Sequence, residues 1–317
     1  MAAEIKVHPA LKRLIDNVES VIKGKSEVVR QAVVGLLARG HLLFEDVPGV
    51  GKTTLAQSLA RSISCSFQRI QFTSDLMPSD IIGVTIYDPS KREFEFKPGP
   101  LFANMVLADE INRTTPKTQS SLLEAMNSAR VSVDKVTYSL PQPFCVIATQ
   151  NPIEFHGTFP LPKSQMDRFM MRLSLGYPDS ANEATILREQ KTLNVALEVN
   201  PVLTAEEIIR MQREVEQVGV EESILDYIVR IAHATREAPG IDLGVSIRGS
   251  LSLRRAAQAL AFSEGRTFVT PDDVKQMAVP TLAHRIQVAK TFESAHLGAR
   301  EDETLLTELL AEVPTPI

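Results

Sequence analysis

Apolar and polar residues follow two rhythms along this chain, and the change between them falls near residue 178. Before it, short apolar or alternating runs predict strands at residues 42–44, 67–72, 105–108 and 144–148. Helical patterns separate these runs, at residues 10–22, 27–38, 53–63 and 116–129. Strands that alternate with helices are typical of a doubly wound α/β core with a central parallel sheet. We therefore predict such a core over residues 1–179.

After residue 178 the pattern is helical. Apolar residues recur at helical spacing in residues 204–217, 222–236, 251–262 and 271–284. Thr204 with Glu207, and Thr270 with Asp273, match the pattern of reciprocal side-chain bonds at helix starts. The change in pattern near residues 178–180 predicts a second, smaller, all-helical domain over residues 180–317.

Two segments of the first domain predict hairpins in addition to the sheet. Residues 78–100 combine glycines and prolines with short apolar alternations, which favours a hairpin inserted in a helical segment. Residues 131–140 alternate around the dipeptide Asp134-Lys135, which is a hairpin signal.

The first strand leads into a sequence typical of a phosphate-binding loop, DVPGVGKTT at residues 46–54. A tight loop between a strand and a helix directs backbone N–H groups and the positive end of the helix dipole at a polyphosphate. Lys52 can reach the outer phosphates, and the Thr53 hydroxyl can ligate Mg²⁺. The strict pattern has glycine where Asp46 stands, so here Pro48 and Gly49 serve the turn. ATP with Mg²⁺ is the cofactor that this loop and the acidic residues below predict.

A pair of carboxylates, Asp109 and Glu110, ends the third strand. In P-loop ATPases an acidic residue at a strand end holds Mg²⁺. A neighbouring glutamate can orient and deprotonate the attacking water. Two solvated acids at a strand end are common in isolation, but their coupling to an upstream P-loop favours a hydrolase. The adjacent carboxylate also distinguishes hydrolases from most P-loop kinases.

Three further polar residues are candidates for phosphate chemistry. Asn151 follows the fourth strand and could bond the γ-phosphate or the water, although an Asn-Pro turn alone explains it. Arg168 could serve a neighbouring subunit as an arginine finger, with Arg172 as a competitor and a surface ion pair as the plainer interpretation. Arg248, at a helix start in the second domain, could reach back to the γ-phosphate.

Composition narrows the class of protein. The balance of 34 Lys and Arg against 39 Asp and Glu gives a net charge of −5, which argues against a general nucleic-acid binder. No apolar run approaches membrane-spanning length and no signal peptide is evident, so we expect a cytoplasmic protein without membrane insertion. Cysteines and histidines form no ligand-spaced pairs, and we interpret them as structural: Cys65, Cys145, His41, His156 and His284.

Taken together, these motifs resemble the AAA+ ATPase superfamily and, within it, the MoxR family. The resemblance runs from about Val18 to about His284, most of the chain. The stretches that carry it are Glu45–Thr53, Leu76–Ile81, Ala108–Gln119, Leu122–Met126 and Ala148–Pro152. Magnesium-chelatase ATPase subunits look like a neighbouring family of similar design. Asp46 in the P-loop looks usual for the MoxR family.

The resemblance implies a role for each motif. Asp109-Glu110 looks like Walker B, Asn151 like sensor 1, Arg168 like the arginine finger and Arg248 like sensor 2. Residues 78–100 are similar to the helix-2 insert, and Arg130–Leu140 to the hairpin before sensor 1. The implied adenine pocket and Walker A loop give these cofactor-binding residues: Val21, Ile22, Gly24, Pro48, Gly49, Val50, Gly51, Lys52, Thr53 and Thr54.

The family also implies an activity and partners. It implies a homo-oligomeric, hexameric ring with ATP held between neighbours, and chaperone-like remodelling of client proteins. A partner with a von Willebrand factor A domain is often involved. One alternative is a nucleotide-gated oligomeric scaffold with little turnover. Another is a DNA motor, but Lys135 at a hairpin tip is the only feature of the sequence that favours it. We therefore do not expect nucleic acid as a partner.

Overall fold

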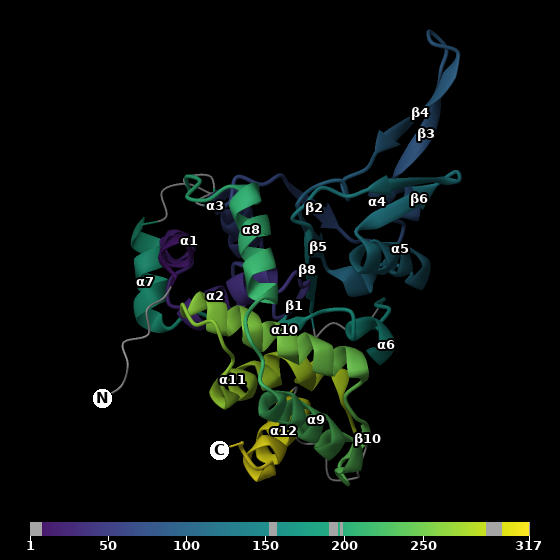
Figure 1. The fold of residues 1–317 in the computed structure, drawn as a ribbon. Coiled ribbons are helices and arrows are strands. Elements are labelled where there is room, and N and C mark those ends of the chain that lie inside the picture. The colour runs from purple at the N-terminus through teal and green to yellow at the C-terminus, as the bar shows by residue number, and fades with distance from the viewer. Residues whose placement is uncertain (1–7, 152–156, 190–195, 197–198, 290–299, 317) are drawn as a thin grey trace.

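The fold is built on a five-stranded parallel sheet (Figure 1). The computed structural model describes residues 8–151, 157–189, 196, 199–289 and 300–316. The strand order is β2-β5-β8-β1-β9. The bounds are β1 (Leu42–Glu45), β2 (Phe67–Gln71), β5 (Met105–Asp109), β8 (Cys145–Gln150) and β9 (Met171–Leu173). The four predicted strands are confirmed, and β9 is an addition that the sequence did not predict.

Helices cover both faces of the sheet, as the doubly wound prediction requires. Alternate residues of each strand join different hydrophobic clusters, with Leu42 and Phe44 of β1 on one face and Leu43 on the other. The first face packs against helices before and after the P-loop, and the second face packs against α5. The helices of residues 1–179 are α1 (Pro9–Glu19), α2 (Ser26–Leu37), α3 (Lys52–Ser62), α4 (Pro78–Ile82), η1 (Ile111–Arg113), α5 (Pro116–Ser128) and α6 (Lys163–Met166). Helix α7 (Ser180–Glu189) begins the segment predicted for the second domain and lies beside α1 in Figure 1, and the boundary near residue 179 stays a prediction.

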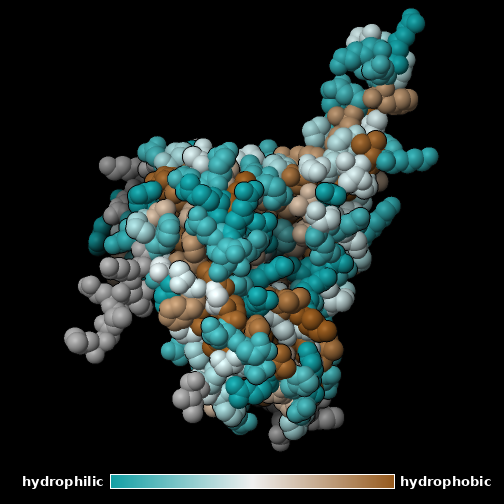
Figure 2. Space-filling view, in the orientation of Figure 1, coloured by the Kyte–Doolittle hydropathy of each residue, from teal (hydrophilic) through white to brown (hydrophobic). Residues whose placement is uncertain are grey.

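Both predicted hairpins are present and lie on the same side of the molecule (Figure 1). Strands β3 (Gly83–Asp88) and β4 (Glu93–Pro98) follow α4 directly, and β6 (Arg130–Val133) pairs with β7 (Val136–Ser139). The first hairpin projects well beyond the body of the molecule (Figure 2).

The C-terminal part is mainly helical, as predicted. Most of it lies below the sheet in Figure 1, whereas α8 lies level with the sheet and contacts α2 and α10. Both predicted helix-start motifs form reciprocal capping bonds, at Thr204 and at Thr270. A short antiparallel pair of strands and a C-terminal helix are additions that the sequence did not predict. The elements are α8 (Ala205–Glu216), α9 (Glu222–Glu237), β10 (Ile241–Leu243), α10 (Ile247–Ser263), α11 (Pro271–Leu282), η3 (Ala283–Arg285), β11 (Gln287–Val288) and α12 (Glu301–Glu312).

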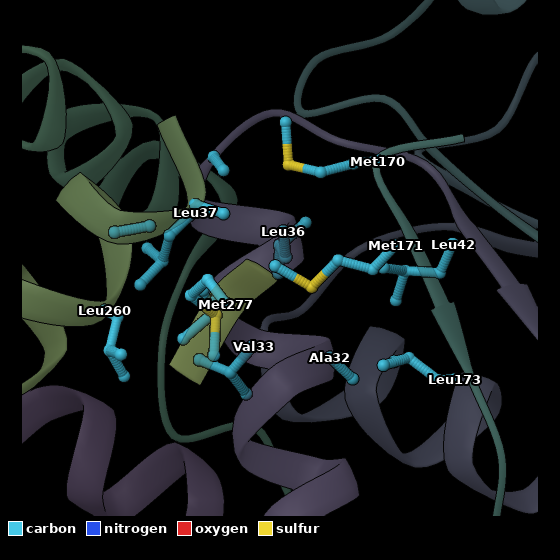
Figure 3. Close-up of a cluster of buried hydrophobic side chains, with 14 of the residues drawn as sticks. Ala32, Val33, Leu36, Leu37, Leu42, Met170, Met171, Leu173, Leu260 and Met277 are labelled. Atoms are coloured by element: carbon cyan, nitrogen blue, oxygen red, sulfur yellow. The ribbon is translucent and has the colours of Figure 1, made fainter. Parts of the chain in front are cut away.

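One hydrophobic cluster runs from the α/β core into the C-terminal helices α8 to α12, which we call the helical lid (Figure 3). Val33 and Leu36 of α2 lie in it with Met171 of β9, Leu260 of α10 and Met277 of α11. Burying this surface stabilises the contact by about 25 cal/mol for each Å² of apolar area removed from water. The helical lid and the sheet therefore share a packed interior in this conformation.

Of the cysteines that we interpret as structural, Cys145 is buried and Cys65 is only partly buried. Cys65 and Cys145 are free thiols, and burial raises the pKa of Cys145 to about 12. His41 and His284 are buried and bonded to main-chain groups, whereas His156 lies outside the described residues. Within the part of the chain that the structure describes, no helix has both the length and the apolar character to cross a bilayer.

Candidate active site

The P-loop connects β1 to α3. Gly49 and Gly51 have φ values of +85° and +98°, in the left-handed region that glycine tolerates. Apart from the glycine itself and its two chain neighbours, no described atom lies within 4 Å of the position that a Cβ would take on either residue. The loop thus leaves open space in front of the N-terminus of α3, whose backbone N–H groups and dipole favour an anion.

The Lys52 side chain crosses this loop. Its Nζ donates hydrogen bonds to the carbonyl oxygens of Asp46 (2.9 Å) and Val47 (3.2 Å). Burial lowers the pKa of Lys52, while the charges of Asp46, Asp109 and Glu110 act in the opposite direction. The ammonium group is therefore within the electrostatic influence of the two carboxylates that the sequence predicts for catalysis.

A cavity of about 330 Å³ opens between the P-loop and the sheet. Its loop wall is formed by Pro48, Gly49, Gly51, Lys52, Thr53 and Thr54. Its sheet wall comes from the carboxyl ends of β2, β5 and β8 and consists of Arg69, Gln71, Asp109, Glu110, Thr149 and Asn151. The structure thus brings the predicted loop residues, both carboxylates and Asn151 together. Val50 is the exception in the loop, because it packs against the hydrophobic core.

Asp109 is fixed at the end of β5 by bonds to both of its carboxylate oxygens. Thr149 Oγ1 donates to Oδ1 (2.6 Å), and Arg69 donates to Oδ2 through Nε (3.1 Å) and Nη2 (2.5 Å). The residue is buried, at 8% exposed. Charge-assisted bonds of this kind are about twice as strong as neutral ones, so the carboxylate has a defined orientation.

Glu110 lies beside Asp109 in a left-handed backbone conformation, with φ of +58°. Gln71 Nε2 donates to its Oε2 (2.8 Å), and Arg113 Nε forms an ion pair with the same oxygen (3.0 Å). The Glu110 N–H donates to Thr149 Oγ1 (2.9 Å). A non-glycine residue in this conformation costs about 1 to 3 kcal/mol, a strain often found at functional sites.

The donor set fits Mg²⁺ rather than a transition metal. Thr53 and Asp109 supply hydroxyl and carboxylate oxygens to the cavity. Mg²⁺ is usually bound through one or two such oxygens, several waters and the phosphates. Among the described residues no group of three or more His, Cys, Asp or Glu side chains could hold a metal ion by itself.

Asn151 occupies the position that the sequence predicts. Strand β8 lies between β5 and β1, so its carboxyl end faces the cavity between the carboxylates and the P-loop. Asn151 is 8% exposed and lines the cavity.

The three candidate arginines are not among the residues that line the cavity. Arg168 is half-buried, and its Nη1 donates to the carbonyl oxygen of Leu123 on α5 (2.8 Å). Arg172 is buried in ion pairs within its own chain, which leaves Arg168 the better placed of the two for a neighbour. Arg248 is exposed in the first turn of α10, where Ser246 caps the helix.

The residues expected around adenine also lie outside the cavity lining. Val21, Ile22 and Gly24 form the turn between α1 and α2. Gly24 has φ of +70°, and a Cβ there would come within 2.3 Å of Asn182 Nδ2 on α7. The adenine role of this turn stays a prediction.

Asp46 has a structural role in the site. Its Oδ1 accepts from Ser174 Oγ (2.8 Å) and the Gly176 N–H (3.1 Å), and its Oδ2 accepts from the Leu175 N–H (2.6 Å). The carboxylate therefore ties the start of the P-loop to the segment that follows β9.

Sequence reasoning missed Arg69, Gln71 and Thr149, which hold the two carboxylates. The signal for the first two was available, because the alternation of β2 places residues two apart on one face. Their partners on β5 follow only from the pairing of β2 with β5, which local sequence patterns do not give.

A P-loop cavity on a parallel sheet, with acidic residues on the neighbouring strand and a helical lid, defines an ATPase of the AAA class. Residues 41–171 match the model of the "ATPase family associated with various cellular activities (AAA)", and residues 233–309 match the AAA lid domain. The crystal structure of a protein from Cytophaga hutchinsonii that is named as an ATPase by inference superposes on this chain with a TM-score of 0.88. The two chains are 38% identical, and the superposition covers 97% of this chain and 95% of the Cytophaga chain.

Within that class the chain belongs to the MoxR family. Chaperone MoxR1 of Mycobacterium tuberculosis is 40% identical over 295 residues, which are 90% of this chain and 77% of that protein. The uncharacterized protein YeaC of Bacillus subtilis is 45% identical over 317 residues, 100% of this chain and 98% of that protein. Magnesium-chelatase subunits match at lower identity. The chain is an ATP-binding ATPase, as the sequence predicts.

Proposed function

We propose that the protein couples ATP hydrolysis to the remodelling of client proteins, as a homo-oligomeric and most simply hexameric ring. The observation that carries the proposal is the cavity, in which Asp109 and Glu110 face the P-loop across a space that a triphosphate tail can enter. Accurately placed charges of this kind accelerate phosphoryl transfer without covalent catalysis.

Each cavity residue has an assigned role in this scheme. Lys52 binds the outer phosphates, and Thr53 and Asp109 hold Mg²⁺, which when bound neutralises phosphate charge. Glu110 accepts a proton from the attacking water while Gln71 fixes its carboxylate (2.8 Å). Asn151 helps to position the same water or the γ-phosphate.

The proposal places Arg168 in the site of the neighbouring subunit. Its Nε is buried and has no hydrogen-bond partner among the described residues, and its Nη1 has a main-chain acceptor. An incompletely bonded guanidinium near the surface can gain partners at a subunit contact. An arginine supplied by a neighbour stabilises transition-state charge, so an isolated subunit hydrolyses ATP slowly.

Arg248 is proposed to follow the nucleotide state from the lid. Its helix α10 contacts the core through the N-cap, because Ser246 Oγ donates to the Asp167 carboxylate (3.1 Å) beside Arg168. Loss of the γ-phosphate would release Arg248 and let α10 move relative to the core.

The hairpin β3–β4 is the proposed route from the nucleotide to a client. It exposes apolar side chains, including Ile86 (43%), Tyr87 (52%) and Phe94 (75%), on a projecting element (Figure 2). Exposed apolar groups of this kind are suited to binding other proteins. A chaperone name in the relative MoxR1 supports such a role. A partner with a von Willebrand factor A domain and a cytoplasmic location belong to the same proposal.

Two other functions compete with this one. A nucleotide-gated scaffold would assemble on ATP and turn it over very little. A DNA motor has little support, because Lys135 lies in a two-residue turn with positive φ values at Asp134 and Lys135, where an exposed lysine is ordinary.

The test is the ATPase rate per subunit against protein concentration, with sedimentation on the same samples. We expect turnover to rise with assembly. Glu110→Gln should still bind ATP and lose about 100-fold or more of the turnover, because proton transfer contributes a factor of this order. Near-normal turnover in that variant would reject the assigned base. Assembly on ATP with negligible turnover at every concentration would favour the scaffold.

A further inference from the structure

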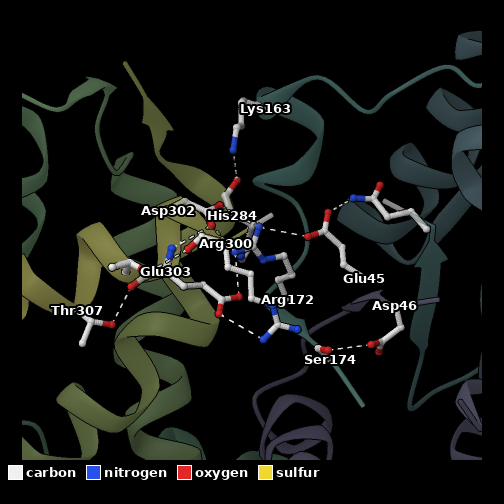
Figure 4. Close-up of polar contacts among 12 residues, drawn as sticks. Glu45, Asp46, Lys163, Arg172, Ser174, His284, Arg300, Asp302, Glu303 and Thr307 are labelled. Atoms are coloured by element: carbon white, nitrogen blue, oxygen red, sulfur yellow. Dashed lines mark hydrogen bonds and ion pairs between the residues drawn. The ribbon is translucent and has the colours of Figure 1, made fainter. Parts of the chain in front are cut away.

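Arg172 of β9 joins parts of the chain that lie far apart in sequence (Figure 4). Its two terminal nitrogens each donate to one oxygen of Asp302 on α12, both at 2.8 Å, and Nη2 also donates to Glu303 (3.0 Å). On its other side Nη1 forms an ion pair with Glu45 of β1 (3.2 Å). The side chain is only 8% exposed, so these bonds are largely removed from water.

The Glu45 side of this network leads directly to the nucleotide cavity. Glu45 is the residue before Asp46, where the P-loop begins, and it also accepts a hydrogen bond from Gln150 Nε2. Gln150 is the last residue of β8 and is followed by Asn151, which lines the cavity. A displacement of the Glu45 carboxylate therefore acts on both walls of the cavity.

The segment that follows β9 holds the P-loop at a second point. Ser174, two residues after Arg172, donates to the Asp46 carboxylate (2.8 Å). Two consecutive residues, Glu45 at the end of β1 and Asp46 at the start of the P-loop, are thus each bonded to β9 or the segment after it. The position of β9 and the position of the loop cannot change independently.

The network is balanced in charge. Its three acids are Glu45, Asp302 and Glu303, and its three bases are Arg172, Lys163 and Arg300. Lys163 Nζ donates to the His284 carbonyl oxygen, and Arg300 pairs with Glu303. Burial lowers the pKa of Arg172, but the bonds to Asp302 and the charges around it outweigh this effect and raise the pKa. Buried pairs of this kind are costly to break on one side only. The fork of Arg172 fits a single arrangement of its partners, which is what a coupling element needs.

From this geometry we propose that Arg172 is a positioning residue for ATP hydrolysis, which couples the lid helix α12 to the P-loop and to the end of β8. The proposal rests on the proposed function of the cavity as the nucleotide site. Because coupling between two sites is reciprocal, nucleotide binding should stabilise α12, and the α12 acids should strengthen nucleotide binding.

The experiment uses the full chain with ADP and a non-hydrolysable ATP analogue. Hydrogen exchange of the amides in residues 301–312 should slow when either nucleotide binds to the wild type. In Arg172→Gln this slowing should be lost, while the amides of the P-loop remain protected. In Asp302→Asn/Glu303→Gln, the nucleotide Kd should rise by roughly 5- to 20-fold, in the lower range of known coupling factors. Arg172→Lys keeps the charge without the fork and should restore part of the coupling.

The matched control is Glu308→Gln, which removes one charge from an exposed position of the same helix and should change neither readout. The Asp302→Asn/Glu303→Gln variant serves if Arg172→Gln does not fold. Two results would overturn the coupling and leave the proposed nucleotide site intact. One is a nucleotide Kd in that double variant equal to the wild-type Kd. The other is an active wild type in which nucleotide does not change the hydrogen exchange of α12. If the wild type binds no nucleotide, or Lys52→Ala binds it with full affinity, the proposed function of the cavity fails with it.

Discussion

At the scale of single residues, Asp46 shows how a P-loop can replace a glycine with a side chain. The carboxylate accepts three hydrogen bonds from residues 174–176, all from donors that are at least partly buried. Asp46→Gly restores the common P-loop residue but leaves these donors unpaired. We expect it to lower the free energy of unfolding by about 2 to 4 kcal/mol, because bonds to a charged group are worth about 1.5 to 3 kcal/mol each and water replaces part of them.

Urea denaturation of Asp46→Gly, Ser174→Ala and the wild type measures this effect. The serine variant removes one donor and leaves the carboxylate its two main-chain bonds, so a loss of about 1 kcal/mol is expected. Equal stability of Asp46→Gly and the wild type would show that the carboxylate does not hold the loop to the segment after β9.

His41 makes stability depend on pH. The Val146 N–H donates to its Nδ1 (3.0 Å), so the proton lies on Nε2, which donates to the Met126 carbonyl oxygen (2.9 Å). Burial lowers the pKa of His41 to about 4. Between pH 6.5 and pH 4 the unfolded chain binds a proton that the folded chain does not, so stability falls as the pH falls.

When the pH falls from 7.5 to 5, this histidine should lower the free energy of unfolding by about 2 kcal/mol. Burial also lowers the pKa of His284, which adds to the loss in the same direction. Urea midpoints across this range give the slope. His41→Gln should flatten the slope, and His233→Asn, at an exposed position on α9, should leave it unchanged. An unaltered slope in His41→Gln would contradict the assignment.

At the scale of elements, aromatic stacking joins the two hairpins. Tyr138 of β7 stacks on Phe96 of β4, with ring centroids 4.3 Å apart, and both rings contact Phe102 edge to face. Such pairs contribute about 0.5 to 1.5 kcal/mol beyond their buried area. Tyr138→Ala should therefore speed hydrogen exchange in residues 83–98 while the ATPase rate stays within about twofold of the wild type. Tyr87→Ala is the control, because Tyr87 contacts Phe94 within the first hairpin. Equal exchange in both variants would mean that the stack does not couple the hairpins.

Elements with a strong local pattern were predictable from the sequence, and elements defined by distant partners were not. The strand runs, the Asp134-Lys135 turn and the capping box at Thr204 encode their structure within a few residues. Strand β9 has three residues, and its place beside β1 depends on pairing across more than a hundred residues. For the same reason Arg172 resembled a free arginine in sequence, whereas its partners on α12 lie 130 residues away. The motif residues of the cavity were predictable, but Arg69 and Gln71 required the strand order.

At the scale of the whole molecule, the lid and the core act as neighbours with specific polar contacts as well as a shared apolar interior. Within the matched lid domain, Arg285 donates to the carbonyl oxygen of Phe169 (2.7 Å), and His284 Nε2 bonds the same oxygen (3.0 Å). Both contacts are buried. Any movement of the lid must exchange these bonds, which favours distinct positions of the lid over continuous drift.

The proposed sharing of each site between two subunits makes a prediction that a single chain cannot satisfy. Lys52→Ala removes the lysine proposed to bind the phosphates, and Arg168→Ala removes the arginine proposed to reach the next subunit. Each variant alone should therefore be inactive while it still assembles. In an equimolar mixture, half of the sites carry Lys52 and half of their neighbours carry Arg168. Because the contacts of the proposed ring are head to tail, about a quarter of the sites are then complete, and about a quarter of the wild-type turnover should return. The mixture is assayed after dissociation and reassembly, with each variant reassembled alone as the control. If turnover does not recover although sedimentation shows mixed assemblies, Arg168 does not act across the subunit contact.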